Sequence, residues 1–134
     1  SLIYWFQDVV KKSNKFQSIE TPITKSKESI LFEKFLHFLS KYYTKERSVS
    51  FYANKLNMAP KYFSTVIKEY SHLSASKWID DYVILESKSL LKYSDLSIKQ
   101  ISDKLNFKNQ SFFGKYFKNL TSMSPLNYRH KETK

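Results

Sequence analysis

The sequence predicts an all-α fold, built from two helix-turn-helix subdomains that are joined by a linker helix. Three observations predict this fold. The 134 residues include only one Gly and three Pro, which leaves little of the turn chemistry that a β-sheet needs. Apolar side chains recur at helical intervals of three and four residues. A unit of about 50 residues also occurs twice, which is too few copies for a solenoid.

The stretch from Ser97 to Tyr128 predicts a helix, a tight turn and a second helix. Ser97 and Gln100 form a capping-box pattern, which predicts a helix start. We expect Asn106 to end this helix in the left-handed conformation, and Asn109 to cap the next one. The predicted core residues are Ile98, Ile101, Leu105, Phe113, Tyr116, Phe117 and Leu120. The predicted solvent-facing residues are Lys99, Ser102, Asp103, Lys104, Ser111, Gly114, Lys115 and Lys118.

The same unit occurs earlier in the chain, between Ser48 and Trp78. Ser48 matches Ser97 at an offset of 49 residues. One extra residue in the second turn raises the offset to 50, so that Phe63 matches Phe113. The predicted helices cover residues 49–56 and 60–71. Their buried stripe is predicted to be Phe63, Val66, Ile67 and Tyr70, and the side facing away Lys61, Ser64, Thr65 and Lys68.

Two further helices are predicted around the first unit. A core helix is expected over residues 29–43, with Ile30, Leu31, Phe35, Phe38, Leu39 and Tyr42 as its apolar side chains. A linker helix is expected over residues 76–92, buried on more than one side through Trp78, Ile79, Tyr82, Val83, Leu85, Leu90 and Leu91. Its predicted length is about 25 Å. Successive major grooves on one face of DNA are about 34 Å apart, so such a linker suits a pair of helices in neighbouring grooves.

The N-terminal residues differ in character from the rest. Residues 2–10 form a wide apolar helical stripe, which suits the end of a preceding domain, a dimerisation helix or an arm packed on the main body. Residues 11–28 are polar and contain Pro22, so they predict a linker. We therefore expect residues 1–28 to be the end of a missing sensing or dimerisation region, with a homodimer possible through it, and residues 29–134 to be the domain.

The charge balance points to a polyanionic partner. The chain has 23 basic and 12 acidic residues, a net charge of +11 and a pI near 9.7. Such an excess usually indicates nucleic acid and less often an anionic membrane surface. The absence of Cys fits a reducing cytosol, and hence a cytoplasmic location. No apolar run approaches the roughly 20 residues of a membrane span, so no membrane partner is expected.

The two units resemble the DNA-binding domain of AraC/XylS-type bacterial transcription regulators over about residues 30–130. The matching residues are Ile101, Leu105, Phe107, Ser111, Phe112, Phe113, Phe117, Lys118, Ser124, Pro125, Tyr128 and Arg129. The resemblance implies two helix-turn-helix units, about 48–72 and 97–121, flanking a linker helix and binding two adjacent major-groove segments of double-stranded DNA. It also implies a regulator, usually an activator, that contacts RNA polymerase and carries a separate sensing domain.

Five positions depart from the family pattern. His72 and Ser122 stand where the family often has Gly, which predicts either mild strain at the ends of the recognition helices or a different type of ending. Val83 replaces a common Arg, which puts in doubt a polar tie between the linker helix and its neighbours. Ser87 stands at the place of an Ala, and Ala59 at the place of a capping Ser.

The exposed sides of the predicted recognition helices supply the candidate DNA contacts. The candidates for base edges are Lys61, Ser64, Thr65, Asn109, Ser111 and Lys115, because Lys donates to guanine and Asn pairs with adenine. The candidates for phosphates are Lys68, Lys108 and Lys118. For each, the alternative is a solvated face. For Tyr62 and Phe112, core packing is favoured over contact with a thymine methyl or a sugar. For Gly114, close approach of DNA or of a helix and plain tolerance are both open.

Other classes of site find little support. His37, His72 and His130 lie far apart and have no Cys partners, so no metal site is expected. No nucleophile with an adjacent base is evident, so we expect no enzymatic activity and no cofactor. The sequence therefore predicts a sequence-specific double-stranded DNA-binding domain. The alternative is a protein-interaction module whose charge only aids solubility, and RNA binding is a third possibility without a supporting motif.

Overall fold

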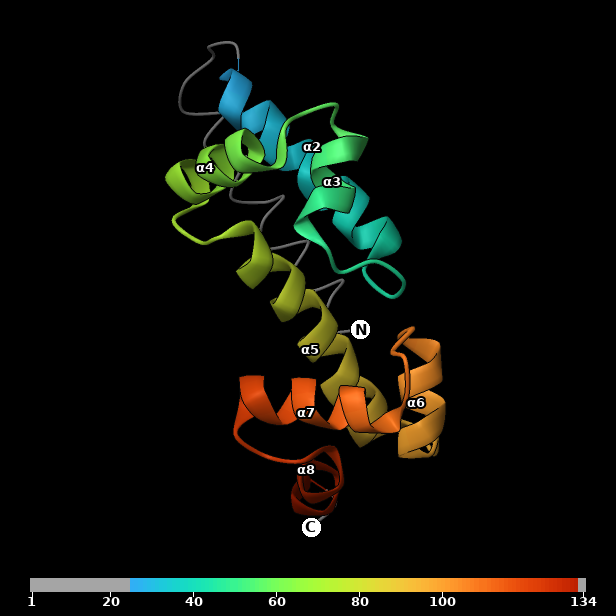
Figure 1. Ribbon diagram of the computed structural model, residues 1–134. Coiled ribbons are helices and arrows are strands. Elements are labelled where there is room, and N and C mark those ends of the chain that lie inside the picture. Colours follow the sequence, from blue (N-terminus) through green and yellow to red (C-terminus); the bar gives the residue numbers. More distant parts are fainter. Residues whose placement is uncertain (1–24, 133–134) are drawn as a thin grey trace.

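The computed structural model describes residues 25–132, which form two helical units at the two ends of one long helix (Figure 1). No strand occurs among these residues, so the all-α prediction is confirmed. The predicted apolar stripe at residues 2–10 and nearly all of the polar linker lie outside the described residues. The helices are α2 (Lys27–Tyr42), α3 (Val49–Lys55), α4 (Pro60–Ser71), α5 (Ala75–Tyr93), α6 (Ile98–Lys104), α7 (Gln110–Thr121) and α8 (Pro125–Glu132).

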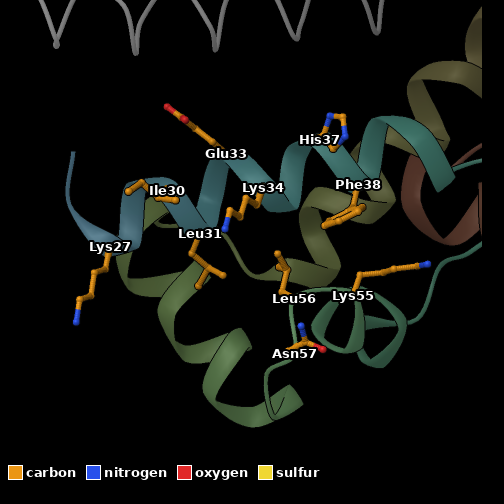
Figure 2. A pocket seen from close by; sticks show the side chains of 10 residues that line it. All are labelled: Lys27, Ile30, Leu31, Glu33, Lys34, His37, Phe38, Lys55, Leu56 and Asn57. Carbon is orange, nitrogen blue, oxygen red and sulfur yellow. The ribbon is translucent and has the colours of Figure 1, made fainter. Parts of the chain in front are cut away.

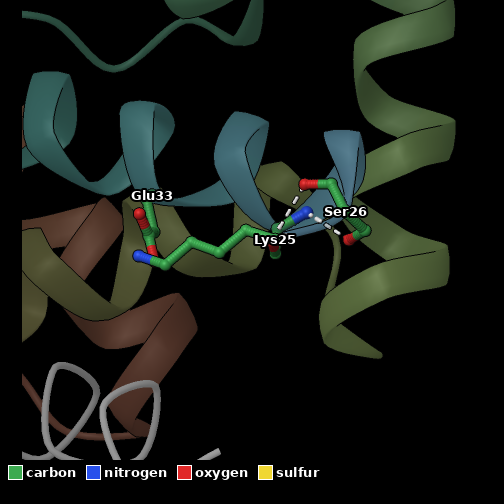
Figure 3. Close-up of polar contacts among 4 residues, drawn as sticks. Lys25, Ser26 and Glu33 are labelled. Carbon is green, nitrogen blue, oxygen red and sulfur yellow. Dashed lines mark hydrogen bonds and ion pairs between the residues drawn. The ribbon is translucent and has the colours of Figure 1, made fainter. Parts of the chain in front are cut away.

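Helix α2 begins two residues earlier than the sequence predicts, because Ser26 caps it. The Ser26 hydroxyl oxygen accepts the Ser29 N–H at 3.1 Å, and Lys25 forms an exposed ion pair with Glu33 at 2.8 Å (Figure 3). The fully buried stripe consists of Phe32, Phe35 and Leu39. The prediction of Ile30 as a core residue is wrong, since its side chain is 41% exposed. Phe32, which the predicted set of core residues does not include, is buried instead.

The first helix-turn-helix consists of α3 and α4. Ser48 caps α3 by accepting the Phe51 N–H at 3.1 Å, and the turn passes through Asn57 at a φ of 56°. Helix α4 begins at Pro60 without a side-chain cap, because its N-cap residue is Ala59. The predicted stripe on α4 is confirmed, with Phe63 and Ile67 fully buried and Val66 and Tyr70 half-buried.

The linker helix α5 contributes to both hydrophobic cores. Trp78, Ile79 and Tyr82 join the core formed with α2, α3 and α4. Ile84 and Leu91 join the second core, which includes residues of α6 and α7. The prediction that this helix is buried on more than one side is confirmed. Among the described residues, no helix is both long and apolar enough to cross a membrane.

The second helix-turn-helix, α6 and α7, repeats the first in three dimensions. The predicted capping box is present: the Gln100 N–H donates to the Ser97 hydroxyl and the Ser97 N–H donates to the Gln100 side chain. Asn106 lies in the turn at a φ of 58°, which confirms its predicted left-handed conformation and matches the 56° of Asn57. Asn109 caps α7 by accepting the Phe112 N–H at 3.0 Å.

The ends of the recognition helices also repeat. His72 after α4 and Ser122 after α7 both have a φ of 67°, in the left-handed region. A side chain with a Cβ is disfavoured in this region by about 1–2 kcal/mol. The mild strain predicted at these two positions is therefore present in the backbone.

Two predictions of burial in the second unit are wrong. The sequence predicts Ser102 on a solvent-facing side, yet its side chain is fully buried, as is that of its counterpart Ala53. The sequence predicts Leu120 in the core, yet it is 42% exposed. Its counterpart Tyr70 packs against Phe32 of α2, with ring centroids 5.4 Å apart. In the second unit α5 takes the place of α2, and its N-terminal turns are already packed in the first core.

Helix α8 is an element that the sequence analysis did not predict. Its signal was present, since Ser124 precedes Pro125, and a Ser before a Pro at the first helical position is a common helix start. The Ser124 hydroxyl accepts the Asn127 N–H at 3.1 Å. Arg129 of α8 donates from Nε to the carbonyl of Leu91 at 2.9 Å, at the C-terminal end of α5. Helix α8 thereby closes the second core against the linker helix.

We expect the Ala59→Ser substitution to stabilise the protein. Ala59 has the extended conformation of an N-cap, with φ −64° and ψ 135°, but no side-chain oxygen to accept an N–H of α4. A capping Ser should raise the free energy of unfolding by about 1 kcal/mol, measured by urea denaturation. The matched control is Asn109→Ala, which removes the equivalent cap of α7 and should lower the free energy by a similar amount. An unchanged midpoint for Ala59→Ser would contradict the prediction.

We expect the Ser102→Ala substitution to stabilise the protein as well. The buried Ser102 hydroxyl has no hydrogen-bond partner among the described residues. Removing a buried, unsatisfied hydroxyl should raise the free energy of unfolding by about 1 kcal/mol, also measured in urea. Ser87→Ala is the control, because Ser87 is equally buried but donates to the Val83 carbonyl at 2.7 Å, so its removal should give no gain. Destabilisation by Ser102→Ala would show that its hydroxyl is satisfied in solution.

Candidate nucleic-acid interface

The two recognition helices lie across α5, α4 near its N-terminal end and α7 towards its C-terminal end (Figure 1). Each has 12 residues and follows a turn that contains a left-handed Asn, Asn57 before α4 and Asn106 before α7. The six residues predicted to contact bases lie at the surface of these helices or at their starts. Lys61, Thr65, Asn109, Ser111 and Lys115 are exposed, and Ser64 is half-buried.

The two recognition faces are equivalent in position but different in chemistry. At the offset of 50 residues, Lys61 in the first turn of α4 corresponds to Ser111, and Thr65 in the second turn corresponds to Lys115. Ser64 corresponds to Gly114. Each face therefore carries one lysine in its first two turns, but on a different turn of the helix.

Internal hydrogen bonds already engage two of the six base-contact candidates. The Thr65 hydroxyl donates to the Lys61 carbonyl at 3.0 Å, which leaves its oxygen free only as an acceptor. The Asn109 side-chain oxygen accepts the Phe112 N–H as a helix cap. The side-chain nitrogen of Asn109 is therefore the group that remains available to donate to a base. Lys61 and Lys115 make no polar contact through their side chains within residues 25–132. Among the six candidates, these two ammonium groups are therefore the donors most available to a ligand.

The three predicted phosphate contacts are all exposed lysines. Lys68 and Lys118 occupy equivalent positions in the last turns of α4 and α7. The Lys68 ammonium donates to the His72 carbonyl at 3.3 Å, which holds it at the end of the helix. Lys108 lies in the turn before α7, with its ammonium 5.6 Å from the centre of the Phe112 ring.

Tyr62 and Phe112 are the aromatic residues that the sequence analysis assigned wrongly. Core packing was favoured, but Tyr62 is 63% exposed and Phe112 is 51% exposed. A signal in the sequence was available, because each lies three residues before a predicted base contact, Thr65 or Lys115, and residues at that spacing share a helical face. The structure therefore adds an exposed aromatic ring to each recognition face.

Half-buried polar groups hold α5 to both units. The Tyr116 hydroxyl of α7 donates to Asp80 of α5 at 2.6 Å, and the Tyr43 hydroxyl donates to Glu86. Burial, with the hydrogen bond to Asp80 as a second cause, raises the pKa of Tyr116 far above its ordinary value. Val83, which replaces the common Arg, is fully buried. The doubt about a polar tie is thus resolved, because carboxylates of α5 provide two such ties.

The two arginines of the chain do not belong to the recognition faces. Arg129 donates to the carbonyls of Leu90 and Leu91, and Arg47 donates to the carbonyls of Leu105 and Asn106. The sequence indicates Arg129 only as a match to the family pattern, and it predicts no role for Arg47. Because both guanidinium groups are bound to backbone, lysines supply the free positive charge of α4 and α7.

A shallow groove of about 620 Å³ lies along α2, away from the recognition faces (Figure 2). Its lining combines apolar side chains, among them Leu31, Phe38 and Leu56, with the polar side chains of Glu33 and His37. None of the predicted DNA-contacting residues lines this groove. Within residues 25–132, no group of three or more His, Asp or Glu side chains is placed to hold a metal ion.

Comparisons with known sequences identify the type of domain. The family model described as a helix-turn-helix domain matches residues 52–131. The HTH-type transcriptional regulator YtdP of Bacillus subtilis is 30% identical over 97 residues, which are 72% of this chain and 13% of that protein. The chain spans less than half of the length of the curated relatives that it matches.

Solved structures share the fold. The C-terminal domain of AraT, a response regulator from Geobacillus stearothermophilus, matches with a TM-score of 0.72 and 23% identity, over 79% of this chain and 88% of that one. The DNA-binding domain of AdpA, a global transcriptional factor solved in complex with a target DNA, matches with a TM-score of 0.66 and 19% identity, over 75% and 90% of the two chains. The arrangement of two helix-turn-helix units around one helix therefore occurs in known proteins.

We expect the Gly114→Ala substitution to stabilise the free protein. A Cβ at this position would meet no atom within 4 Å, so close approach of a neighbouring helix does not explain the Gly. Alanine should raise the free energy of unfolding in urea by about 1 kcal/mol, because Gly is the poorer helix former. Ser64→Gly at the equivalent position of α4 is the control and should destabilise.

Binding of the Gly114→Ala variant to duplex DNA separates the two remaining explanations. An affinity loss despite the higher stability would indicate close approach of DNA, and an unchanged affinity would indicate tolerance. A lower free energy of unfolding would contradict the prediction.

Proposed function

Because the chain belongs to the AraC-type helix-turn-helix family and is the DNA-binding domain of a transcription regulator, we propose that it reads double-stranded DNA by inserting α4 and α7 into adjacent major grooves. One observation carries this proposal. Two equivalent helices, each with exposed lysines and an exposed aromatic ring, lie across the two ends of a single helix. A single chain therefore carries two recognition helices and does not need a second copy of itself to present both.

The dimensions of the helices suit this mode of binding. Helices α4 and α7 are each about 18 Å long, and the major groove is about 12 Å wide, so either helix can enter with its N-terminal turns at the base edges. Helix α5 has 19 residues, a length of about 28 Å. Together with the widths of the two units, it can separate the recognition helices by about one helical turn of DNA, 34 Å.

The proposed roles of the side chains follow from their donors and positions. Lys61 and Lys115 donate to guanine, and the amide nitrogen of Asn109 donates to a base edge. Lys68, Lys108 and Lys118 bind phosphates and set the register of the protein on the duplex. Further candidate base contacts are Ser64, Thr65 and Ser111. The rings of Tyr62 and Phe112 supply apolar surface for a thymine methyl or a sugar.

The difference between the two faces implies two different DNA elements. The lysine of α4 lies in the first turn and that of α7 in the second, where Thr65 and Ser111 occupy the alternative positions. Two identical half-sites would place the same base against different side chains. The proposed operator is therefore a pair of unlike elements rather than a repeat.

The wider parts of the proposal rest on the family. Regulators of this type usually activate transcription through contact with RNA polymerase, and we extend this role to the whole protein. Its place of action would be the bacterial cytoplasm, where the DNA lies. Dimerisation through the N-terminal region is a further part, and it adds avidity rather than a new reading surface.

The alternative of a protein-interaction module makes a different prediction about salt. A DNA-binding domain that neutralises about six phosphates loses about a thousandfold in affinity between 50 and 200 mM salt. An apolar protein interface depends little on salt over this range. Sites selected from random duplex DNA, titrated at both salt concentrations, distinguish the two readings, since a protein-interaction module yields no enriched site.

We expect Lys61→Ala and Lys115→Ala each to weaken binding to the selected site and to relax the preference within one element only. A lost base contact costs about 1–3 kcal/mol, or about 5- to 160-fold in Kd. Lys118→Ala is the matched control. It should weaken binding to all sequences alike and reduce the slope of log affinity against log salt by about one. Unchanged affinity and preference in both base-contact variants would show that the reading surface lies elsewhere.

A further inference from the structure

The two units touch each other directly, in addition to sharing α5. Arg47 lies in the loop between α2 and α3, and its Nη1 donates to the carbonyl of Leu105 at 2.6 Å. Its Nη2 donates to the carbonyl of Asn106 at 2.9 Å. The centre of its guanidinium also lies 3.9 Å from the centre of the Phe107 ring. One side chain of the first unit thus binds the turn of the second helix-turn-helix through three contacts.

The contact also runs in the opposite direction. The side-chain nitrogen of Asn106 donates to the carbonyl of Lys45 at 2.9 Å, across 61 residues of sequence. Asn106 is held in the left-handed conformation with a φ of 58°. In this conformation Asn106 makes two contacts with the first unit, through its side-chain nitrogen and through its carbonyl. We name Arg47, Asn106 and Phe107, with the carbonyls that they contact, the inter-unit clamp.

The chemistry of the clamp requires a guanidinium group in one orientation. The carbonyls of Leu105 and Asn106 follow the C-terminal end of α6, where unpaired carbonyls carry partial negative charge and attract a cation. The planar guanidinium presents a fork of N–H groups and stacks on an aromatic face, which an ammonium cannot reproduce. Burial lowers the pKa of Arg47, because it removes water from the charge. Carbonyls and ring take the place of that water.

The position of the clamp determines what it can control. Helix α5 alone joins the two units covalently, and a single helix between two small units allows bending and twisting about its axis. The clamp adds a second point of attachment, between the α2–α3 loop and the α6–α7 turn. The Asn106–Phe107 turn leads directly into α7. A fixed position of this turn relative to the first unit therefore fixes the direction of α7 relative to α4.

We propose that Arg47 and Asn106 are positioning residues, and that their clamp sets the separation and rotation between the two recognition helices. The consequence for recognition, which rests on the proposed function, is selectivity for one spacing between the two DNA elements. Neither residue needs to touch DNA for this role. With the clamp removed, each helix still reads its own element, but the pair tolerates other spacings.

The first test measures the geometry without DNA. The chain has no Cys, so spin labels attach only to introduced cysteines at Glu69→Cys and Asn119→Cys, which are exposed and equivalent positions in α4 and α7. Double electron–electron resonance should give one narrow distance distribution with the clamp intact. Arg47→Ala and Asn106→Gly should each broaden it. Glycine keeps the left-handed turn of Asn106 and removes only the side chain.

Asn57→Gly is the matched control for the label experiment. It makes the same change in the equivalent turn of the first unit, at a φ of 56°, and should leave the distribution narrow. A distribution that is equally narrow in all variants, or already broad with the clamp intact, would overturn the proposal. Asn106 is exposed, so Asn106→Gly keeps the test decisive if Arg47→Ala fails to fold.

The second test measures spacing selectivity on the two elements found by site selection. One inserted base pair shifts the elements by about 3.4 Å and rotates them by about 35°. The unaltered protein should lose about tenfold or more in affinity, whereas Arg47→Ala and Asn106→Gly should lose about threefold or less, because a flexible connection adapts to both spacings. Arg47→Lys keeps the charge without the fork and should behave like Arg47→Ala.

The outcomes separate the clamp from the proposed function. Wild-type spacing selectivity in Arg47→Lys, or in both Arg47→Ala and Asn106→Gly, would overturn the clamp while DNA reading stands. Failure of the unaltered protein to bind any duplex would overturn the proposed function, and the label distances would still decide whether the clamp fixes the two helices.

Discussion

The structure depends on one helix that is buried in two hydrophobic cores. Helix α5 places Trp78 and Ile79 in the first core and Ile84 and Leu91 in the second. Each unit is too small to bury enough apolar surface from two short helices, so each needs α5 as a further wall. The two units are therefore connected by a helix that is part of both cores, and not by a flexible linker. The length of α5 and the angular position of its apolar residues determine where each unit is attached along the helix.

Sharing α5 makes the two units unequal, although they repeat each other in sequence. The first unit has α2 as an additional helix, and Phe32 of α2 covers Tyr70 at the end of α4. In the second unit α5 takes the place of α2, and Leu120 at the corresponding position of α7 is left partly exposed. The surfaces around the two recognition helices differ for this reason. The unlike side chains of their reading faces add to the asymmetry.

Some charged side chains bind other parts of the protein, and others remain exposed to solvent. Asp80 and Glu86 of α5 accept hydroxyl groups from Tyr116 and Tyr43, and the two arginines bind backbone carbonyls. These groups hold helices together at the borders between the units. The lysines of α4 and α7 remain exposed at the surface. The recognition helices therefore keep positive charge that is available to a polyanion, and the internal charges keep these helices in place.

The sequence by itself determined the features that depend on residues a few positions apart. The capping box at Ser97, the cap at Asn109, the left-handed turn at Asn106 and the two-fold repeat were all predictable, because helix starts, turns and periodicity are set by local hydrogen bonds and spacing. The candidate faces of α4 and α7 followed from the same periodicity.

Only the tertiary structure decided what lies at the borders between elements. Ser102 is buried, Leu120 and Phe112 are exposed, and Arg47 reaches a turn 58 residues away. The physical reason is that burial depends on which element comes to lie over a side chain. In this protein one helix is shared by two cores, and no local pattern records that arrangement.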